Sequence, residues 1–181
     1  MKCKFLSVYI LSLIGLFATC QKPSTNVNEP CIIQTDTVAV ASKLLTLTDA
    51  EKIMGEPAKL TCNTFIKKGD TLEYKCDYTA LSQDTITSKI GKLYFMYEAY
   101  REVAAAANAY AAIYEANSRH EGVEVVSGLG NEAYYHSDQT GFYFFLVRKN
   151  EKMFRLKLNK VTSRSSVVEF KEATRRIVDK L

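Results

Sequence analysis

The sequence predicts one α+β domain, in which helices pack against an antiparallel sheet. Segments with apolar residues at alternate positions, which is typical of half-buried strands, fall into two groups of three. A segment with helical spacing of its apolar residues follows each group, and a shorter helical segment precedes the first group. The expected order is therefore α-β-β-β-α-β-β-β-α, and strand groups followed by helices favour a sheet with helices packed on it.

The first helix is expected over residues 48–54. Thr48-Asp49-Ala50-Glu51 has the form of a capping box, in which a Thr hydroxyl and a Glu carboxylate accept each other's free backbone N–H groups. Gly55 and Pro57 are residues that end helices.

The next segment, CNTFIKKGDTLEYKC (residues 62–76), predicts a β-hairpin centred on Gly69. That symmetry sets Cys62 opposite Cys76, and only Phe65 then breaks the alternation of apolar and polar residues. Opposite residues of an antiparallel pair have Cα atoms roughly 4.5 to 5.5 Å apart, which suits a disulfide. We therefore expect a structural Cys62–Cys76 disulfide.

Other roles for these cysteines remain as alternatives. A redox pair or a metal site would use the same thiols, although no CxxC spacing or nearby set of ligands favours either. Cys31 is then the odd cysteine, which is free, bonded to another chain, or in competition for Cys62 or Cys76.

A third strand within residues 89–100 leads directly into an alanine-rich helix over residues 101–117. Helical spacing predicts that its buried face consists of Val103, Ala107, Tyr110, Ala111 and Tyr114. Four tyrosines, Tyr97, Tyr100, Tyr110 and Tyr114, could instead form an aromatic ligand site. Aromatic residues at helical spacing are more often part of a core, so we favour the core interpretation.

Strand-like sequence resumes beyond Gly122. Turns are expected at residues 138–141 and 149–152, with a hairpin formed by residues 141–148 and 152–158. Ser166 opens a C-terminal helix. Its expected buried stripe consists of Val167, Phe170, Thr174, Ile177, Val178 and Leu181.

A glycine-containing segment, VVSGLGNEAYYHSD (residues 125–138), is the best candidate for a binding loop. Glycines at 128 and 130 permit positive φ and close backbone approach, and polar side chains follow at a strand end. The candidate residues are Gly128, Gly130, Asn131, Tyr134, His136 and Asp138. The segment is not a nucleotide-binding fingerprint, because Ala133 replaces the third glycine and a strand follows.

The N-terminus has the pattern of a secretory signal over residues 1–19. Lys2 and Lys4 precede a thirteen-residue apolar run, FLSVYILSLIGLF, and small residues follow it. As a helix this run would be roughly 20 Å long, against about 30 Å for the hydrocarbon core of a membrane. It is therefore too short to span comfortably.

The end of this signal, FATCQK, resembles the looser lipobox of Bacteroidota lipoproteins, with Phe17 and Thr19 departing from the stricter pattern. The resemblance implies that Cys20 is lipidated by diacylglycerol, with palmitate or similar chains, and becomes the first mature residue. Several acyl chains make a stable anchor. The implied location is the bacterial cell envelope, with the outer membrane favoured over the inner. The alternatives are an ordinary cleaved signal in which Cys20 is incidental, or a segment that is retained as an anchor.

Residues 20–42 contain two of the three prolines with Ser, Thr and Asn between them, and are expected to form a tether before a single domain at residues 43–181. Removal of the signal with Lys2 and Lys4 lowers the formal charge from +4 to +2. Both signs are spread along the chain, which argues against a nucleic-acid partner.

Two segments, LLTLTDAEKIMGEPAKLTC and GLGNEAY, resemble envelope lipoproteins of unknown function with a Mog1/PsbP-like domain. The resemblance covers about residues 44–181 and implies an α/β sandwich. It implies no catalytic residue.

The sequence offers little for catalysis, and we expect no cofactor and no metal site. The chain has two histidines, His120 and His136, and lacks the nucleophile motif GxSxG. Zinc bound through both histidines and Asp138 would require separated segments to converge. The expected function is a non-catalytic binding or accessory module with an envelope protein or a small ligand as partner. The alternative is an envelope hydrolase or metal-dependent enzyme that uses the His136 loop.

We predict that the mature protein in the membrane fraction begins at Cys20 and carries the added mass of acyl chains. Intact mass spectrometry, with and without reductant, measures this mass, and a Cys20→Ala variant is the control. A soluble, unacylated chain would contradict the lipoprotein interpretation.

Overall fold

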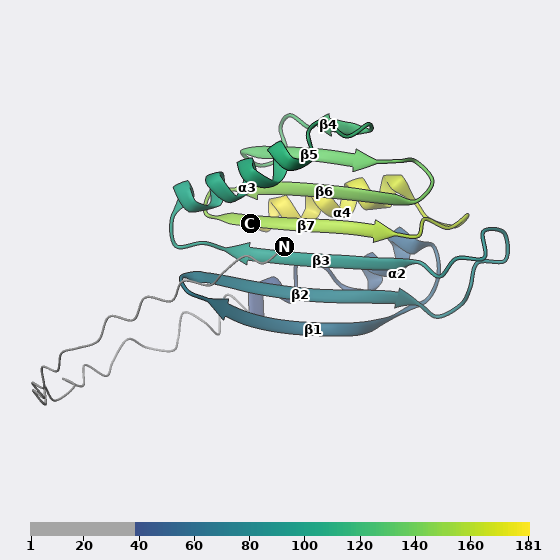
Figure 1. Ribbon diagram of the computed structural model, residues 1–181. Coiled ribbons are helices and arrows are strands. Elements are labelled where there is room, and N and C mark those ends of the chain that lie inside the picture. Colours follow the sequence, from purple (N-terminus) through teal and green to yellow (C-terminus); the bar gives the residue numbers. More distant parts are fainter. Residues whose placement is uncertain (1–38) are drawn as a thin grey trace, which may run out of the picture. The chain divides into compact units, whose positions relative to one another are not determined.

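The computed structural model describes residues 39–181, which form a seven-stranded antiparallel sheet with helices on both of its faces (Figure 1). The prediction of an α+β domain with an antiparallel sheet is confirmed. The expected signal, Cys20, Cys31 and nearly all of the expected tether lie outside the described residues. Ala41 is already fully buried, two residues before the expected start of the domain.

The strands follow the order β1-β2-β3-β7-β6-β5-β4 across the sheet. They are β1 (Ala58–Lys68), β2 (Thr71–Ala80), β3 (Lys92–Ala99), β4 (Val123–Val125), β5 (Glu132–Ser137), β6 (Phe142–Lys149) and β7 (Lys152–Asn159). The expected order lacked β4, a three-residue strand that pairs with Tyr134–His136 of β5. A strand of three residues is too short to show a recognisable alternation of apolar and polar residues.

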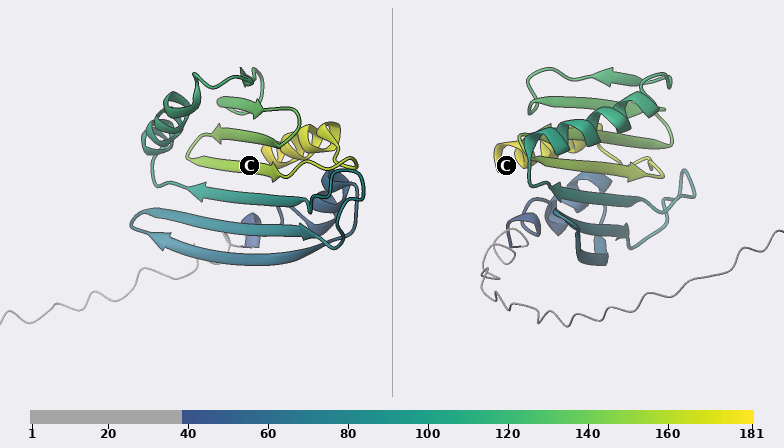
Figure 2. Two further views of the ribbon diagram at one scale, coloured as in Figure 1. Left: turned by 45° about the vertical axis from the view of Figure 1, so that its right-hand side comes forward. Right: turned by 60° about the vertical axis from the view of Figure 1, so that its left-hand side comes forward.

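Three helices complete the described elements: α2 (Leu47–Met54), α3 (Val103–Asn117) and α4 (Val167–Asp179). None of them has the length and hydropathy that crossing a membrane requires. Helices α2 and α4 lie behind the sheet in Figure 1, whereas α3 lies in front of it, and the views in Figure 2 agree.

The main core lies between the sheet and the α2/α4 layer. Phe170 of α4 is fully buried there, with ring centroids 5.7 Å from Tyr143 and 5.8 Å from Phe145. The buried stripe expected for α4 is confirmed at Phe170, Thr174, Ile177 and Val178, and Val167 and Leu181 pack at its margin.

Helix α3 covers only one half of the opposite face, where its side chains pack on β5, β6 and β7. The other half, over β1, β2, β3 and part of β7, carries no helix of the described residues. We call this surface the open face. Its central side chains are Glu73, Lys75 and Asp77 of β2, Tyr94, Met96 and Glu98 of β3, and Arg155 and Lys157 of β7.

Helix α2 begins earlier than expected. Its N-cap is Thr46, whose hydroxyl accepts from the Asp49 N–H while the Asp49 carboxylate accepts from the Thr46 N–H. The prediction that Thr48 and Glu51 form the capping box is wrong, because Asp49 also pairs with Arg176 of α4 at 2.9 Å and this favours the earlier start. Gly55 ends the helix at φ 70°, as expected.

The expected register of the β1–β2 hairpin is wrong by one residue. A two-residue turn, Gly69-Asp70, pairs Lys68 with Thr71, so Cys62 lies opposite Asp77 and Asn63 lies opposite Cys76. Phe65, the residue that broke the expected pattern, then lies opposite Tyr74 and packs on the core.

This register also corrects the disulfide prediction. Adjacent strand residues point to opposite faces, so Cys76 faces the core while Cys62 shares the face of Asp77. Both are free thiols, and burial raises the pKa of Cys76 to about 11. The structure therefore predicts no mass change on reduction at this pair.

The buried face of α3 is rotated relative to the prediction. Ala106 and Tyr110 are buried, and Ala109, Ile113 and Tyr114 pack beside them, whereas Val103 is 51% exposed and Ala111 is also exposed. The prediction is confirmed at Tyr110 and Tyr114, which contact Tyr134 of β5 at ring-centroid distances of 6.3 Å and 5.5 Å, and it is wrong at Val103 and Ala111. Alanines on several sides of the helix give only weak amphipathicity, so spacing alone did not fix the buried face.

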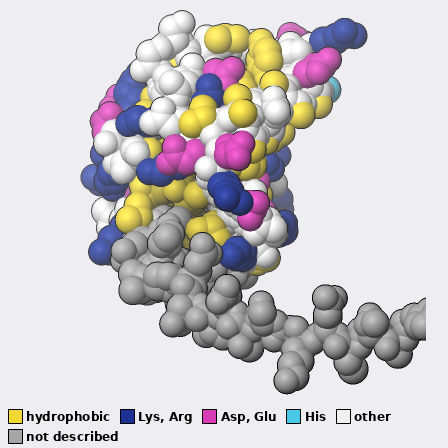
Figure 3. Space-filling model, turned by 90° about the vertical axis from the view of Figure 1, so that its left-hand side faces the viewer, with side chains coloured by type: hydrophobic (Ala, Val, Ile, Leu, Met, Phe, Trp, Pro, Cys, Tyr) yellow, Lys and Arg dark blue, Asp and Glu magenta, His cyan; other side chains and the backbone are white. Residues whose placement is uncertain are grey.

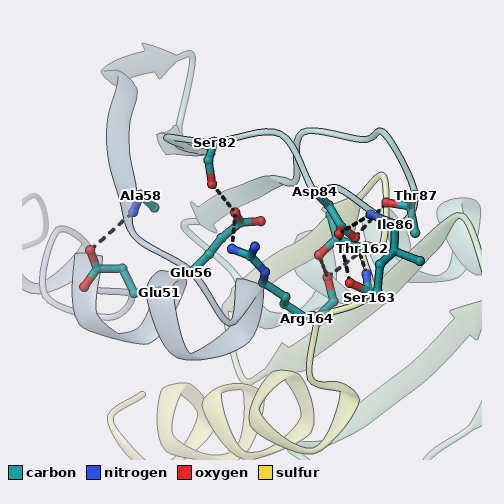
Figure 4. A network of polar contacts seen from close by, with 11 residues as sticks. Glu51, Glu56, Ala58, Ser82, Asp84, Ile86, Thr87, Thr162, Ser163 and Arg164 are labelled. Atoms are coloured by element: carbon teal, nitrogen blue, oxygen red, sulfur yellow. Dashed lines mark hydrogen bonds and ion pairs between the residues drawn. The ribbon is translucent and has the colours of Figure 1, made fainter.

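A polar network ties the loop between β2 and β3 to the loop before α4 (Figure 4). The buried Asp84 carboxylate accepts from the N–H of Ser163 at 2.6 Å, from the N–H of Ile86 at 3.0 Å and from the Thr87 hydroxyl at 2.8 Å. These hydrogen bonds hold the pKa of Asp84 far below its ordinary value. Nearby, Glu56 accepts from Ser82 and lies 3.6 Å from Arg164.

We predict that Phe170→Ala lowers the free energy of unfolding by about 3 to 5 kcal/mol, because it leaves a cavity beneath two aromatic rings. Chemical denaturation of the full chain measures the change. The matched control is Val168→Ala on the exposed side of the same helix, where the valine is 64% exposed and the expected change is within about 0.5 kcal/mol. Equal effects would contradict the assigned packing of α4.

Candidate functional site

The glycine loop between β4 and β5 packs closely on the β6–β7 hairpin. Gly128 and Gly130 both have positive φ, at 74° and 69°. A Cβ on Gly130 would lie 2.5 Å from the Arg148 carbonyl oxygen, and the Asn131 side chain accepts from the Asn150 N–H at 2.6 Å. The glycines and Asn131 therefore have a structural explanation, which is the close approach of two chain segments.

Two surface depressions flank this loop. One of about 310 Å³ opens toward α4 and is lined in part by Gly128, Lys171 and Arg175, and one of about 280 Å³ opens toward α3 beside Tyr110 and Asn131. The two basic residues of the first depression have partners within the protein. Lys171 lies 4.8 Å from the centroid of the Tyr135 ring, and Arg175 pairs with Glu172.

The remaining predicted loop residues lie elsewhere. Tyr134 is 1% exposed beneath α3, and burial raises its pKa to about 12. His136 and Asp138 lie near the opposite end of β5 from Gly130, so the six predicted residues do not form one site. Asp138 accepts backbone N–H bonds from Gly141 at 2.6 Å and from Phe142 at 3.0 Å, which stabilise a turn.

The two histidines do come together. The rings of His120 and His136 stack with their centroids 6.0 Å apart, and His136 meets Phe142 edge-on at 4.8 Å. Between residues 39 and 181, no group of three or more His, Cys, Asp or Glu side chains is placed to hold a metal ion. Asp138 does not join the pair as a third ligand.

The four tyrosines considered as an aromatic ligand site are divided between the two faces of the sheet. Tyr97 lies in the core beneath α2 and α4, whereas Tyr100, Tyr110 and Tyr114 belong to the cluster under α3. They are packing residues, as favoured from the sequence.

The site that sequence reasoning missed is a groove of about 290 Å³ on the open face. We call it the open-face groove. It is lined by Tyr94, Phe95, Met96 and Phe144, with Lys75, Asp77, Arg155 and Lys157 among them. Most of its exposed surface is apolar, yet three cations and one carboxylate surround it.

Strand register explains how the groove is assembled. One row across the sheet reads Asp77, Tyr94, Lys157, Phe144, and the next reads Lys75, Met96, Arg155, Leu146. Apolar and charged side chains therefore alternate as neighbours on adjacent strands. A signal was present in β3, because Tyr94 and Met96 make its second face apolar as well as the face that carries Leu93 and Phe95.

Two buried carboxylates hold cations beside the groove. Glu73 and Glu98 lie opposite each other at 3% and 8% exposure. Glu73 pairs with Lys75 at 2.7 Å and with Lys68 at 3.1 Å, and Glu98 pairs with Arg155 at 3.0 Å. Burial alone would raise the pKa of Glu73, but the hydrogen bonds and charges of these two lysines lower it below its ordinary value.

Lys157 and Arg155 retain unused hydrogen-bonding capacity. Within the described part of the chain, Lys157 makes no ion pair and lies 5.3 Å from the centroid of the Phe142 ring. The Nε of Arg155 is buried and has no hydrogen-bond acceptor among the same residues, although its Nη2 donates to Glu98. The Arg155 side chain as a whole is 32% exposed, so its guanidinium group still presents positive charge to the groove.

We predict that Glu73→Gln lowers the free energy of unfolding by about 1 to 2 kcal/mol at neutral pH, since both lysine partners are partly exposed and screened. The pKa of Glu73 is lowered in the folded state, so its stabilisation is present above its ordinary pKa of 4.5 and is lost as the pH falls. Denaturation from pH 3 to 7 should show the difference from wild type shrinking on acidification. The control is Glu115→Gln, at an exposed position of α3. A difference in unfolding free energy between wild type and Glu73→Gln that does not change with pH would contradict the role assigned to Glu73.

Comparison with known proteins gives no match. No family model matches the chain, and neither a curated protein nor a solved structure is similar to it.

Proposed function

We propose that this chain is a lipid-anchored module of the bacterial cell envelope that binds a ligand or partner on its open face and catalyses no reaction. The observation that carries the proposal is the open-face groove, in which Tyr94, Met96 and Phe144 border exposed apolar surface on a sheet. The anchor is proposed from the signal at residues 1–19 and from Cys20, and outer-membrane attachment is the favoured location.

The composition of the open face supports binding rather than ordinary solvation. Side chains on the solvent face of an antiparallel sheet are usually polar, because nothing covers them. Here two aromatic residues and a methionine lie on β3 and β6, the strands on either side of β7, at or next to the helix-free half. Apolar surface of this kind, bordered by charged residues, is typical of interaction sites.

On the side of the molecule to the left in Figure 1, the described side chains show no patch of a single charge in Figure 3. The end of the molecule shown in Figure 3 carries hydrophobic, basic and acidic side chains interspersed. Mixed charge of this kind favours solubility and does not point to nucleic acid.

The finer fold assignment is also part of the proposal. An antiparallel sheet with helices on both faces supports a Mog1/PsbP-like sandwich, which the sequence segments at residues 44–62 and 128–134 resemble.

The proposal predicts that the open face is occupied in the envelope. Lysines are acetylated both in intact membranes and in purified full-length protein, and mass spectrometry measures the extent at each residue. The comparison is between Lys157 of the groove and Lys52, which is exposed on α2. We expect Lys157 acetylation to be at least threefold lower in membranes after normalisation to Lys52. Equal ratios in the two preparations would contradict occupation of this face.

A further inference from the structure

We infer that the open-face groove binds a small amphipathic anion, whose apolar body lies between Tyr94 and Phe144 and whose acidic group contacts Lys157 and Arg155. The inference rests on the proposed function, because it names the class of ligand for the same face.

The apolar half of the site is defined by strand geometry. Tyr94 and Phe144 both lie directly opposite Lys157, on the two strands that flank β7. Adjacent strands are about 4.8 Å apart, so the backbones that carry the two aromatic rings are roughly 10 Å apart. Met96 lines the groove beside them. A flat ring system or a short alkyl chain fits this space, since about 290 Å³ is at the low end of small-molecule sites.

The acidic group is inferred from the donors that the protein leaves unused. Lys157 and Arg155 are two residues apart on β7 and face the same side, which separates their backbones by about 7 Å. The Arg155 side chain is 32% exposed beside its contact with Glu98, and Lys157 has no ion-pair partner within residues 39–181. One carboxylate, sulfonate or phosphate group has enough acceptor oxygens to bond both.

The neighbouring charges favour one orientation of the ligand. Lys75 is held by Glu73 at 2.7 Å, so it adds positive potential without needing to contact the ligand. Asp77, the carboxylate that lines the groove, lies at the β2 side and repels an acidic group from there. The acidic group is therefore expected over β7, with the apolar body across the groove.

Other ligand chemistries fit less well. A cation would meet Lys75, Arg155 and Lys157 together. A neutral apolar molecule would cover the groove without supplying a counter-charge for Lys157 and Arg155. A long polyanion would also meet Glu73, Glu98 and Asp77, which interrupt the positive charge on this face.

The test compares naphthalene-2-sulfonate with naphthalene-2-sulfonamide, which has nearly the same shape and no charge at neutral pH. Both are titrated calorimetrically into the purified full-length protein, with empty detergent micelles subtracted. We expect the sulfonate to bind about tenfold more tightly than the sulfonamide, because a charge-assisted hydrogen bond is stronger than a neutral one.

Variants separate the two halves of the site. Lys157→Gln should reduce the preference for the sulfonate, because only the Arg155 contact then remains, and it should leave sulfonamide binding unchanged. Tyr94→Ala should weaken both ligands about tenfold. Lys52→Gln, on the opposite side of the sheet, removes the same charge and should change neither. Equal affinity of wild type for the two ligands, or a sulfonate affinity that Lys157→Gln does not lower, would overturn the inference.

The outcome also distinguishes this inference from the proposed function. Protection of Lys157 in membranes without sulfonate binding would retain a binding face and reject the anionic ligand class. Sulfonate binding without protection in membranes would retain the site chemistry and reject occupation in the envelope. Absence of both would reject both.

Discussion

The pairing of β3 with β7 is the constraint on which the rest of the structure depends. Every other pair in the sheet joins strands that are consecutive along the chain, whereas this one joins Lys92–Ala99 to Lys152–Asn159 across more than fifty residues. It closes the largest loop in the sheet and so carries the greatest entropic cost of pairing. The open-face groove lies across it, with Tyr94 and Met96 on one strand and Arg155 and Lys157 on the other. The candidate site therefore exists only when the two halves of the sheet have joined.

The sequence pattern correctly predicted those elements that depend only on residues within one continuous segment. The apolar stripe of α4 and the β6–β7 hairpin follow from spacing and turn residues, and both are found. Errors arose where two local solutions were nearly equivalent. Thr46 and Thr48 each precede an acidic residue by three positions, and alanines on nearly every side of α3 give no preferred buried face. The groove could not be predicted because its residues meet only through the β3–β7 register. Phe65 was the one local clue to the hairpin register, and it was treated as an exception.

Buried charge on the open face serves to position other charges. Glu73 and Glu98 face each other across β2 and β3, and each is compensated by cations that border the groove. Without a cation partner, either carboxylate would destabilise the fold, because burial of an unpaired charge is unfavourable.

The edges of the sheet, by contrast, are protected against strand addition. Edge strand β1 has a bulge between Leu60 and Cys62 and exposed lysines, and edge strand β4 has only three residues. The face of the sheet is therefore better suited to binding than its edges.

The two free thiols have a further consequence, because they differ in burial and position. Cys76 of β2 is fully buried in the main core, while Cys62 is half-buried beside the bulge of edge strand β1. A thiol reagent reaches a buried cysteine only from an opened state, so its reaction rate reports the population of that state. Cys62 would report local fraying of β1, and Cys76 would report the opening of the core. Within residues 39–181, these two thiols would therefore report separately on the periphery of the fold and on its interior.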